Sequence, residues 1–426
     1  RKIVTLDITG AYLNADIEGE DVYMLLDDLS TAILLQIEPN YKEFVQYNGT
    51  CIVKLKKALY GLVQSALLWY KHISATLEGI GFIKNPSDHC VFNLEGREQC
   101  TVVLYVDDLL MTCKDQAILD IVVKHIRDIY KDITVNTGKK HDYLGVLFDF
   151  TTNGTVKISM KKYIEDLIEA YGITKTAKSP AGSDLLNISE GTLLDKEGQD
   201  VFHSAIAKLL YLSKRVRPEI QFAVSFLCTR VNIATEYDNK KLVRVLQYLK
   251  DDPDLGLTLE IGTSEDITID AYVDAAYGNH TDGKGHTGML ISLGKGGAVN
   301  AKSTKQKLVS KSSTEAELIA VSDSSSQIIW TRDFLANQGY NTGPANIYQD
   351  NQSTIKLVEK GKSTSEKTRH INIRYFFIKD RVDNGELIIR YLPTDHMIAD
   401  ILTKPLQGTL FIKLRNLLLN HIPQQP

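Results

Sequence analysis

The chain has 426 residues, of which 43% are hydrophobic and 24% charged, as is typical of a folded globular protein. Its length is typical of about three domains. Its five cysteines form no CxxC pair, which argues against a disulfide framework or a zinc site and favours a reducing, intracellular setting, and no apolar run is long enough to cross a membrane. With a net charge of −4, any nucleic-acid contact requires a local basic surface.

Residues 1–150 alternate β-rich runs with helical stretches. Strands are predicted where β-branched and aromatic residues gather, over 3–8, 101–106 and 143–150. Helices are predicted over 62–77 and 117–130, where the apolar residues have helical spacing. The chain opens on Arg1 inside a predicted strand, which suggests a piece of a larger polypeptide.

The segment Tyr105-Val106-Asp107-Asp108 is the most informative one in the chain. It lies between two apolar runs, and this pattern predicts two strands joined by a tight turn with both aspartates at its tip. Two adjacent carboxylates repel each other unless a cation neutralises them. Asp7, at the end of the first predicted strand, would extend this pair to a three-carboxylate site for Mg²⁺. The alternatives are a solvated acidic turn for the pair and a turn or cap for Asp7.

The middle of the chain is predicted to be mainly helical. Residues 160–171 place Tyr163, Leu167 and Ala170 on one helical face. Residues 179–199 are rich in glycine, serine and acids and are predicted to form a linker. Helical segments follow over 202–231 and 239–251. From residue 267 the apolar residues instead alternate with period two, which predicts a strand at the start of a mixed α/β domain.

Three motifs in the first part of the chain together resemble a known family. They are Leu6-Asp7-Ile-Thr-Gly-Ala-Tyr12, Ala58-Leu-Tyr-Gly-Leu-Val-Gln64-Ser-Ala-Leu-Leu-Trp69 and Tyr105-Val-Asp107-Asp108. In order and spacing they resemble palm motifs A, B and C of the reverse transcriptases of copia-type LTR retrotransposons. The resemblance implies a right-hand polymerase palm in which Asp7, Asp107 and Asp108 are catalytic and bind two ions, Mg²⁺ or else Mn²⁺.

The resemblance also implies a set of substrate-binding residues. Tyr12 matches the bulky residue that excludes a 2′-hydroxyl, with a plain core tyrosine as the alternative. Gln64 matches a glutamine of the nucleotide pocket, and Tyr105 belongs to motif C. Tyr143-Leu144-Gly145 matches the hairpin that grips the primer end. The implied partners are an RNA template, a DNA primer, an RNA–DNA hybrid, deoxynucleoside triphosphates and other parts of the Pol polyprotein, with no membrane.

A second group of acidic residues lies in the last third of the chain. Asp274, Glu317, Asp350 and Asp400 occur in the order and setting that resemble RNase H, in which four carboxylates hold two Mg²⁺ ions. Each has an ordinary alternative: a strand-end turn for Asp274, a capping box with Thr314 for Glu317, a helix N-cap for Asp350 and an exposed helix acid for Asp400.

A run of lysines precedes the predicted helix that carries Glu317. Lys302, Lys305 and Lys307, with Lys311 after them, are expected to contact the nucleic acid, and a solvated surface is the alternative. His370 resembles a histidine segment of the family, with its role open between packing and nucleic-acid contact.

Some positions depart from the family pattern. Val63, Ala66 and Leu67 stand where a lysine and a Pro-Arg pair are usual, Ala276 replaces a second aspartate, and Phe376 replaces a frequent histidine. The basic fingers strands are expected to precede Asp7, before the chain begins. We therefore expect either a full polymerase and nuclease, a decayed or truncated copy with only RNase H activity, or a non-catalytic nucleic-acid-binding protein.

The expected fold class is a multidomain α+β and α/β protein, with an N-terminally truncated right-hand palm, a thumb and a connection before an RNase H-like domain. The expected divisions are the palm with partial fingers (1–150), thumb and linker (151–200), connection (201–262), RNase H-like domain (263–405) and a polar, frayed tail (406–426). The family also implies a cytoplasmic location in virus-like particles, with later access to the nucleus.

Overall fold

The structure is a computed structural model, and it describes residues 1–19, 21–188, 191–260, 266–294, 296–360 and 372–421. The chain divides into two compact units, residues 1–141 and 142–426. His370 lies outside the described residues. No helix in the described ranges is both long enough and apolar enough to cross a bilayer.

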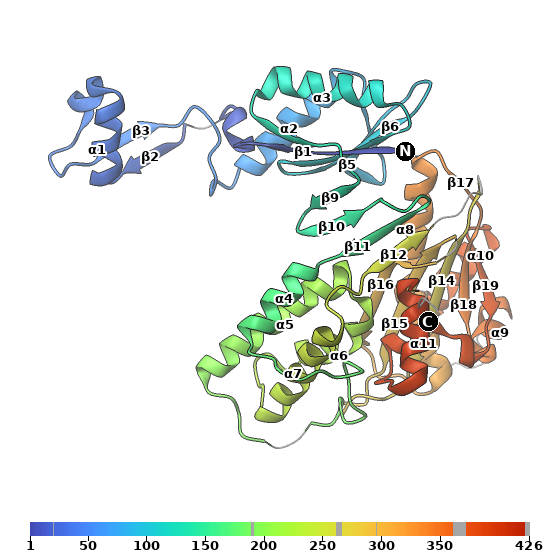
Figure 1. The fold of residues 1–426 in the computed structure, drawn as a ribbon. Coiled ribbons are helices and arrows are strands. Elements are labelled where there is room, and N and C mark those ends of the chain that lie inside the picture. Colours follow the sequence, from blue (N-terminus) through green and yellow to red (C-terminus); the bar gives the residue numbers. More distant parts are fainter. Residues whose placement is uncertain (20, 189–190, 261–265, 295, 361–371, 422–426) are drawn as a thin grey trace. The chain divides into compact units, whose positions relative to one another are not determined.

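The first unit is built on a six-stranded antiparallel sheet with two helices (Figure 1). The strand order is β4-β5-β6-β7-β1-β8, with bounds Ile83–Asn85, Asp88–Leu94, Cys100–Tyr105, Asp108–Cys113, Lys2–Ile8 and Ile133–Asn136. Helices α2 (Ser65–Glu78) and α3 (Gln116–Tyr130) share one hydrophobic core with this sheet. In α3 the buried residues recur at helical spacing and form a single apolar face: Leu119, Val122, Ile126 and Tyr130. The strands predicted over 3–8 and 101–106 and the helices predicted over 62–77 and 117–130 are confirmed to within a few residues. The strand predicted over 143–150 is wrong as a single strand, because a turn at Leu144 and Gly145 divides it into two.

A smaller hairpin lies in the same unit between the first and second sequence motifs. Strands β2 (Tyr23–Leu26) and β3 (Cys51–Lys54) pair antiparallel, and α1 (Asp28–Ile37) and the 3-10 helix η2 (Pro39–Phe44) lie between them in the chain. It lies within residues 1–150, for which a palm with partial fingers is expected. Its assignment as fingers stays a prediction.

The second unit begins with a small sheet and a group of helices. The sheet has the order β12-β11-β10-β9, with bounds Leu257–Glu260, Thr155–Ser159, Val146–Asp149 and Lys140–Tyr143, of which β9 spans the boundary between the units. The helices are α4 (Lys161–Ala170), α5 (Lys196–Arg215), the 3-10 helix η3 (Pro218–Ile220), α6 (Gln221–Cys228) and α7 (Glu236–Asp251). Since α5 begins at Lys196, the linker predicted over residues 179–199 ends earlier.

The prediction of a polar, frayed tail over residues 406–426 is wrong for most of that length. Residues 408–419 form helix α11 (Gly408–Leu419), and four of its apolar residues are buried in the same core as α4–α7: Phe411, Leu414, Leu418 and Leu419. The Phe411 ring lies edge-on to Tyr248, with 5.6 Å between centroids. Because these apolar residues recur at three- and four-residue spacing, one face of the helix is removed from water.

The rest of the second unit is a five-stranded sheet with helices. The order is β16-β15-β14-β18-β19, with bounds Ala298–Lys305, His286–Leu293, Ile269–Ala276, Ala345–Gln349 and Leu387–Tyr391. β14 is antiparallel to β15 and parallel to β18. Helix α8 (Ser313–Asn337) packs on this sheet, with α9 (Gln352–Lys360), α10 (Asn372–Asp383) and the 3-10 helices η5 (Thr394–His396) and η6 (Ile398–Leu402) completing the fold (Figure 1). The predicted period-two strand is β14, and its odd-numbered residues from Ile269 to Ala275 lie in the core.

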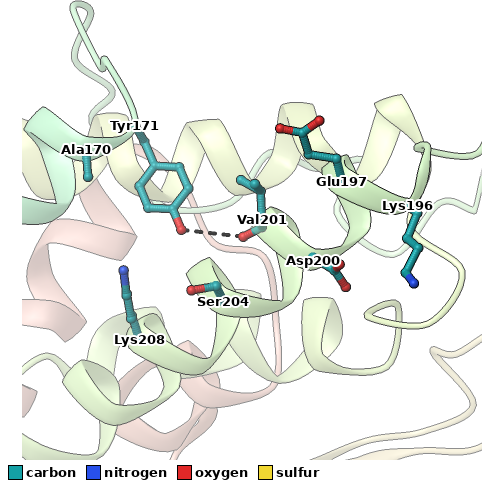
Figure 2. Close-up of a pocket in the computed structure, with 8 residues that line it drawn as sticks. All are labelled: Ala170, Tyr171, Lys196, Glu197, Asp200, Val201, Ser204 and Lys208. Atoms are coloured by element: carbon teal, nitrogen blue, oxygen red, sulfur yellow. Dashed lines mark hydrogen bonds between the residues drawn. The ribbon is translucent and has the colours of Figure 1, made fainter. Parts of the chain in front are cut away.

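A hollow of about 730 Å³ lies between the end of α4 and the first half of α5 (Figure 2). Tyr171 donates a hydrogen bond to the Val201 carbonyl oxygen at 3.4 Å across it. Two lysines and two acids line the hollow, so it has no net charge: Lys196, Lys208, Glu197 and Asp200. None of the predicted catalytic carboxylates lies in it, so the candidate sites must be found from the carboxylates themselves.

Candidate active sites

Three of the downstream carboxylates meet in one place. Asp274 lies on β14, Glu317 in the second turn of α8, and Asp350 directly after β18. One oxygen from each of the three lies within 4.8 Å of the other two. Among the described residues this is the group of His, Cys, Asp and Glu side chains that could hold a metal ion. The parallel pairing of β14 with β18 is what brings Asp274 and Asp350 to the same end of the sheet.

Hydrogen bonds orient each of these carboxylates and exclude its ordinary alternative. Asp274 is 2% exposed and accepts a hydrogen bond from the Thr403 hydroxyl, so it is not a turn residue. Glu317 accepts from Gln349 Nε2 at 3.1 Å. The N-cap of α8 is Ser312, whose hydroxyl accepts from the backbone N–H of Glu315, so the expected capping box between Thr314 and Glu317 is absent.

Asp350 does not cap the helix that follows it. The backbone N–H of Thr354 donates instead to Asn351 Oδ1 at 3.0 Å, at the start of α9. Asp350 Oδ2 accepts from the Thr394 hydroxyl at 2.8 Å. The carboxylate is therefore held by a side chain from η5, and it points into the three-carboxylate group.

Asp400 lies beside this group rather than within it. It is 7% exposed on η6, so the alternative of an exposed helix acid is wrong. Lys404 Nζ lies 2.7 Å from Asp400 Oδ1 and 3.7 Å from Asp274 Oδ2. The ammonium group thus bridges two buried carboxylates. Sequence reasoning missed Lys404, although its spacing of four residues from Asp400 is a usual one for an ion pair on a helix.

Burial and mutual repulsion disfavour the charged forms of these acids. Burial raises the pKa of Asp274, and it raises the pKa of Glu317 well above its usual value, with Asp274 and Asp350 adding to the effect on Glu317. Burial, followed by the charge of Asp274, raises the pKa of Asp400 to about 6. Carboxylates held together in this way gain stability from a cation. Their oxygens are the donors that Mg²⁺ prefers, so the residues present fit a divalent ion.

The upstream aspartates are arranged on neighbouring strands. Asp7 of β1 and Asp108 of β7 are directly paired across the antiparallel ladder, and the backbone N–H of Ile8 donates to the Asp107 carbonyl oxygen at 3.1 Å. Directly opposite residues have Cβ atoms about 4.5–5.5 Å apart, and like charges in this position repel. Partial burial, then Asp107 and Asp132, raises the pKa of Asp7. Among the described residues, these three do not form a group as close as the downstream one.

The turn between β6 and β7 is strained and is held by a tryptophan. The predicted hairpin is confirmed, and Val106 at its tip has a φ of 55°, which is unfavourable for a β-branched residue. Trp69 Nε1 donates to the Val106 carbonyl oxygen at 2.6 Å from the buried side of α2. Tyr105, at the other end of the turn, is 56% exposed. The motif B tryptophan therefore fixes the motif C turn.

Two tyrosines lie beside the upstream aspartates. The ring of Tyr12, on the 3-10 helix η1 (Ala11–Asn14), lies 4.5 Å from the ring of Tyr60, centroid to centroid. Tyr60 is 54% exposed, and burial of its hydroxyl, then the charge of Asp107, raises its pKa. Sequence reasoning missed Tyr60. Gln64 lies at the start of α2, and its Nε2 is buried without a hydrogen-bond partner among the described residues.

The remaining predicted substrate-binding residues lie in the second unit. Tyr143 is 8% exposed, and Leu144 and Gly145 form a turn in which both have positive φ values. The Leu144 carbonyl oxygen accepts a hydrogen bond from the Tyr211 hydroxyl at 2.9 Å. Their contact with a primer stays a prediction.

The predicted lysine cluster is only partly free to bind an anion. Lys305 on β16 pairs with Asp282 at 2.9 Å, and this hydrogen bond lowers the pKa of Asp282 to about 2. Lys302 is half-buried on the same strand, and Lys307 is exposed after it. A role of these lysines in nucleic-acid binding stays a prediction.

Comparison with known proteins shows what the chain is similar to. Residues 1–181 match the family model described as reverse transcriptase (RNA-dependent DNA polymerase). The chain is 31% identical to the Pol polyprotein from transposon RE1 of Arabidopsis thaliana and 30% identical to that from transposon TNT 1-94 of Nicotiana tabacum, in both cases over 95% of this chain. Residues 1–181 carry a reverse transcriptase domain, and the chain as a whole is similar to Pol polyproteins of copia-type transposons.

The chain spans only part of the length of these relatives, 26% of the Arabidopsis polyprotein and 30% of the tobacco one. Its fold is similar to that of the foamy viral protease-reverse transcriptase solved with an RNA/DNA hybrid, with a TM-score of 0.51 and 12% identity over 92% of this chain and 44% of that one. The expected fold class, a reverse transcriptase followed by an RNase H-like domain, is confirmed.

Proposed function

We propose that this protein hydrolyses the RNA strand of RNA–DNA hybrids in its second unit and extends a DNA primer on an RNA template in its first. The observation that carries the nuclease proposal is the meeting of Asp274, Glu317 and Asp350 within 4.8 Å, with Asp400 bound to Lys404 beside them. Four acids gathered in a nearly buried place are unfavourable without cations. Their arrangement supports a site built to hold divalent ions.

The chain's own residues would hold and orient those ions. Asp274, Glu317 and Asp350 would offer oxygens to a divalent ion, and Asp400 would add a fourth carboxylate beside them. Bound Mg²⁺ or Mn²⁺ supplies neutralisation of phosphate charge and activates a hydroxyl nucleophile. Thr403, Gln349 and Thr394 donate hydrogen bonds to three of the carboxylates and so keep their oxygens directed at one point.

A labelled RNA–DNA hybrid with Mg²⁺ tests the nuclease proposal. Loss of a residue that only supports a metal ligand typically lowers activity by about 10–100-fold. Asp274→Asn removes a proposed ligand itself, so it is expected to lower the cleavage rate by more than this. Asp270→Asn is a matched control, because Asp270 lies on the same strand and accepts from Asn346 Nδ2 at 2.8 Å, outside the carboxylate group. Equal cleavage by the wild type and Asp274→Asn would refute the assignment.

Primer extension tests the polymerase proposal separately. The double change Asp107→Asn and Asp108→Asn is expected to abolish extension of a DNA primer with deoxynucleoside triphosphates. Asp128→Asn is the control, because Asp128 is exposed on α3 and pairs with Lys124 of the same helix. Extension that survives the double change would show that these aspartates do not carry the reaction.

A nuclease without polymerase activity is the second candidate. Val63 and Leu67 are 102% and 57% exposed at the start of α2, where the copia-type pattern carries cationic residues. Exposed apolar side chains there cannot attract a triphosphate. If polymerisation has been lost for this reason, Val63→Lys with Leu67→Arg is expected to restore primer extension while hybrid cleavage stays unchanged. No gain in extension would exclude this explanation.

A further inference from the structure

Helix η6 carries Asp400 and lies directly on strand β15. Gly288 of β15 is paired with Asp274 of β14. A Cβ atom on Gly288 would lie 2.7 Å from Thr403 Cγ2, 2.9 Å from the Ala399 carbonyl oxygen and 2.9 Å from Leu402 Cβ. No side chain fits in these spaces, so glycine is what allows η6 and Thr403 to approach Asp274 across the sheet.

A buried chain of side chains joins the same strand to the end of η6. His280 Nε2 lies 3.0 Å from His286 Nδ1, and His286 Nε2 lies 2.8 Å from Ser303 Oγ. Ser303 Oγ donates to the Leu402 carbonyl oxygen at 2.7 Å. The three side chains are 6%, 0% and 4% exposed, in the order His280, His286, Ser303. The chain is thus shielded from water along its length.

The last acceptor sets the direction of every hydrogen bond in the chain. A carbonyl oxygen has no proton, so the Ser303 hydroxyl proton must lie toward Leu402. Ser303 Oγ then accepts from His286 Nε2, which must carry a proton. The next contact requires His286 Nδ1 to accept from a protonated His280 Nε2. Burial lowers the pKa of His280 to about 4 and that of His286 to about 3, so both imidazoles are neutral at neutral pH.

We propose that His280, His286 and Ser303 are positioning residues that anchor η6 on the sheet and thereby hold Asp400 and Thr403 against Asp274. The proposal rests on the proposed nuclease function for its effect on catalysis, but the hydrogen-bonded chain itself does not depend on that function. The Leu402 carbonyl lies two residues from Asp400, and Thr403 donates directly to Asp274. If the hydrogen bond from Ser303 to the Leu402 carbonyl oxygen is lost, Asp400 and Thr403 are therefore both released from their positions beside Asp274. His280, His286 and Ser303 are not proposed to touch the reacting atoms themselves.

The first test measures the protons directly in the wild-type chain. Nitrogen-15 chemical shifts of the histidine side chains distinguish the two neutral tautomers and the charged form. We expect His280 and His286 both to be neutral with the proton on Nε2, at neutral pH and without metal. A proton on Nδ1 of His286, or a charged ring at either position, would overturn the proposal. This outcome is independent of any enzymatic activity.

The second test breaks the chain at one point and then restores it. Ser303→Ala and His286→Phe are expected to lower kcat for hybrid cleavage by about 10–100-fold, the usual effect of losing a supporting partner, with KM for the hybrid unchanged. Both are also expected to raise the Mn²⁺ concentration needed for half-maximal binding in calorimetry of the protein with Mn²⁺ alone. His286→Gln keeps a side-chain N–H for Ser303 and is expected to recover most of the loss.

Ser325→Ala is the matched control. Ser325 is 0% exposed on α8 and donates to the Val321 carbonyl oxygen at 2.7 Å within its own helix. The Ser325→Ala variant loses a buried serine hydrogen bond that lies within α8 rather than at η6. If Ser303→Ala and His286→Phe match Ser325→Ala in kcat and in Mn²⁺ binding, the three residues are merely structural and the proposal fails. If the wild type binds Mn²⁺ but cleaves no hybrid, the proposed function fails, and the Mn²⁺ titrations still decide on the anchor.

Discussion

Replacing Lys404 by methionine isolates the charge that bridges two buried acids. The substitution keeps the length and the apolar part of the side chain but removes the ammonium group that lies 2.7 Å from Asp400 and 3.7 Å from Asp274. A hydrogen bond between charged groups contributes about 1.5–3 kcal/mol to stability. The lysine side chain is 37% exposed, so solvent screening reduces the expected loss to about 1–2 kcal/mol without metal.

Divalent ions are expected to offset this loss. An ion that binds Asp274 and Asp400 supplies the missing positive charge, and in the wild type it must first displace the ammonium group. Since binding to the native state stabilises it, excess Mg²⁺ should stabilise Lys404→Met more than the wild type. The difference in unfolding free energy between the two proteins should then shrink toward zero.

Denaturant unfolding with EDTA and with excess Mg²⁺ measures both effects. Trp330 on α8 provides a fluorescence signal within the same domain. Lys413→Met is the control, because Lys413 is a lysine on α11 that donates to the Asp395 carbonyl oxygen at 3.2 Å and is exposed. Equal losses for Lys404→Met with and without Mg²⁺, or no loss at all in EDTA, would refute the bridging role of Lys404.

Three further results are expected. Because the Asp400 pKa is raised to about 6, the native state binds this proton more tightly than the unfolded state does. The free energy of unfolding without metal should therefore fall as the pH rises from about 4 to 6, by at most about 3 kcal/mol. Asp400→Asn should make the free energy of unfolding less dependent on pH in this range, and an unchanged slope would contradict the assignment. Trp69→Phe removes the hydrogen bond to Val106 and should lower the free energy of unfolding of the first unit by about 1–3 kcal/mol in chemical denaturation, since it leaves a partly buried carbonyl group unpaired. Phe411→Ala should lower the free energy of unfolding by about 3–5 kcal/mol, because Phe411 is 2% exposed. Leu417→Ala should lower it far less, because Leu417 is 47% exposed. Equal losses for the two variants would place α11 outside the core.

Local patterns in the sequence determined most of the elements and the identity of the acids. The apolar-acidic-apolar pattern around Asp107 predicted the hairpin that the structure shows, and period-two spacing predicted β14. These predictions succeed because strand alternation and turn composition depend on neighbouring residues alone. The C-terminal helix α11 was missed although its apolar residues recur at helical spacing, and the structure adds the core in which they are buried.

The four acids of the second unit could be named from the sequence, but not their different environments. Asp274, Glu317 and Asp350 come together because strands far apart in the chain pair in parallel, while Asp400 reaches them through η6. Only the tertiary structure shows that Lys404 bridges two of them and that His286 joins β15 to η6. The chemistry of a carboxylate depends on its burial and on its neighbouring charges, and residues as far as 129 positions away in the chain contact Asp274.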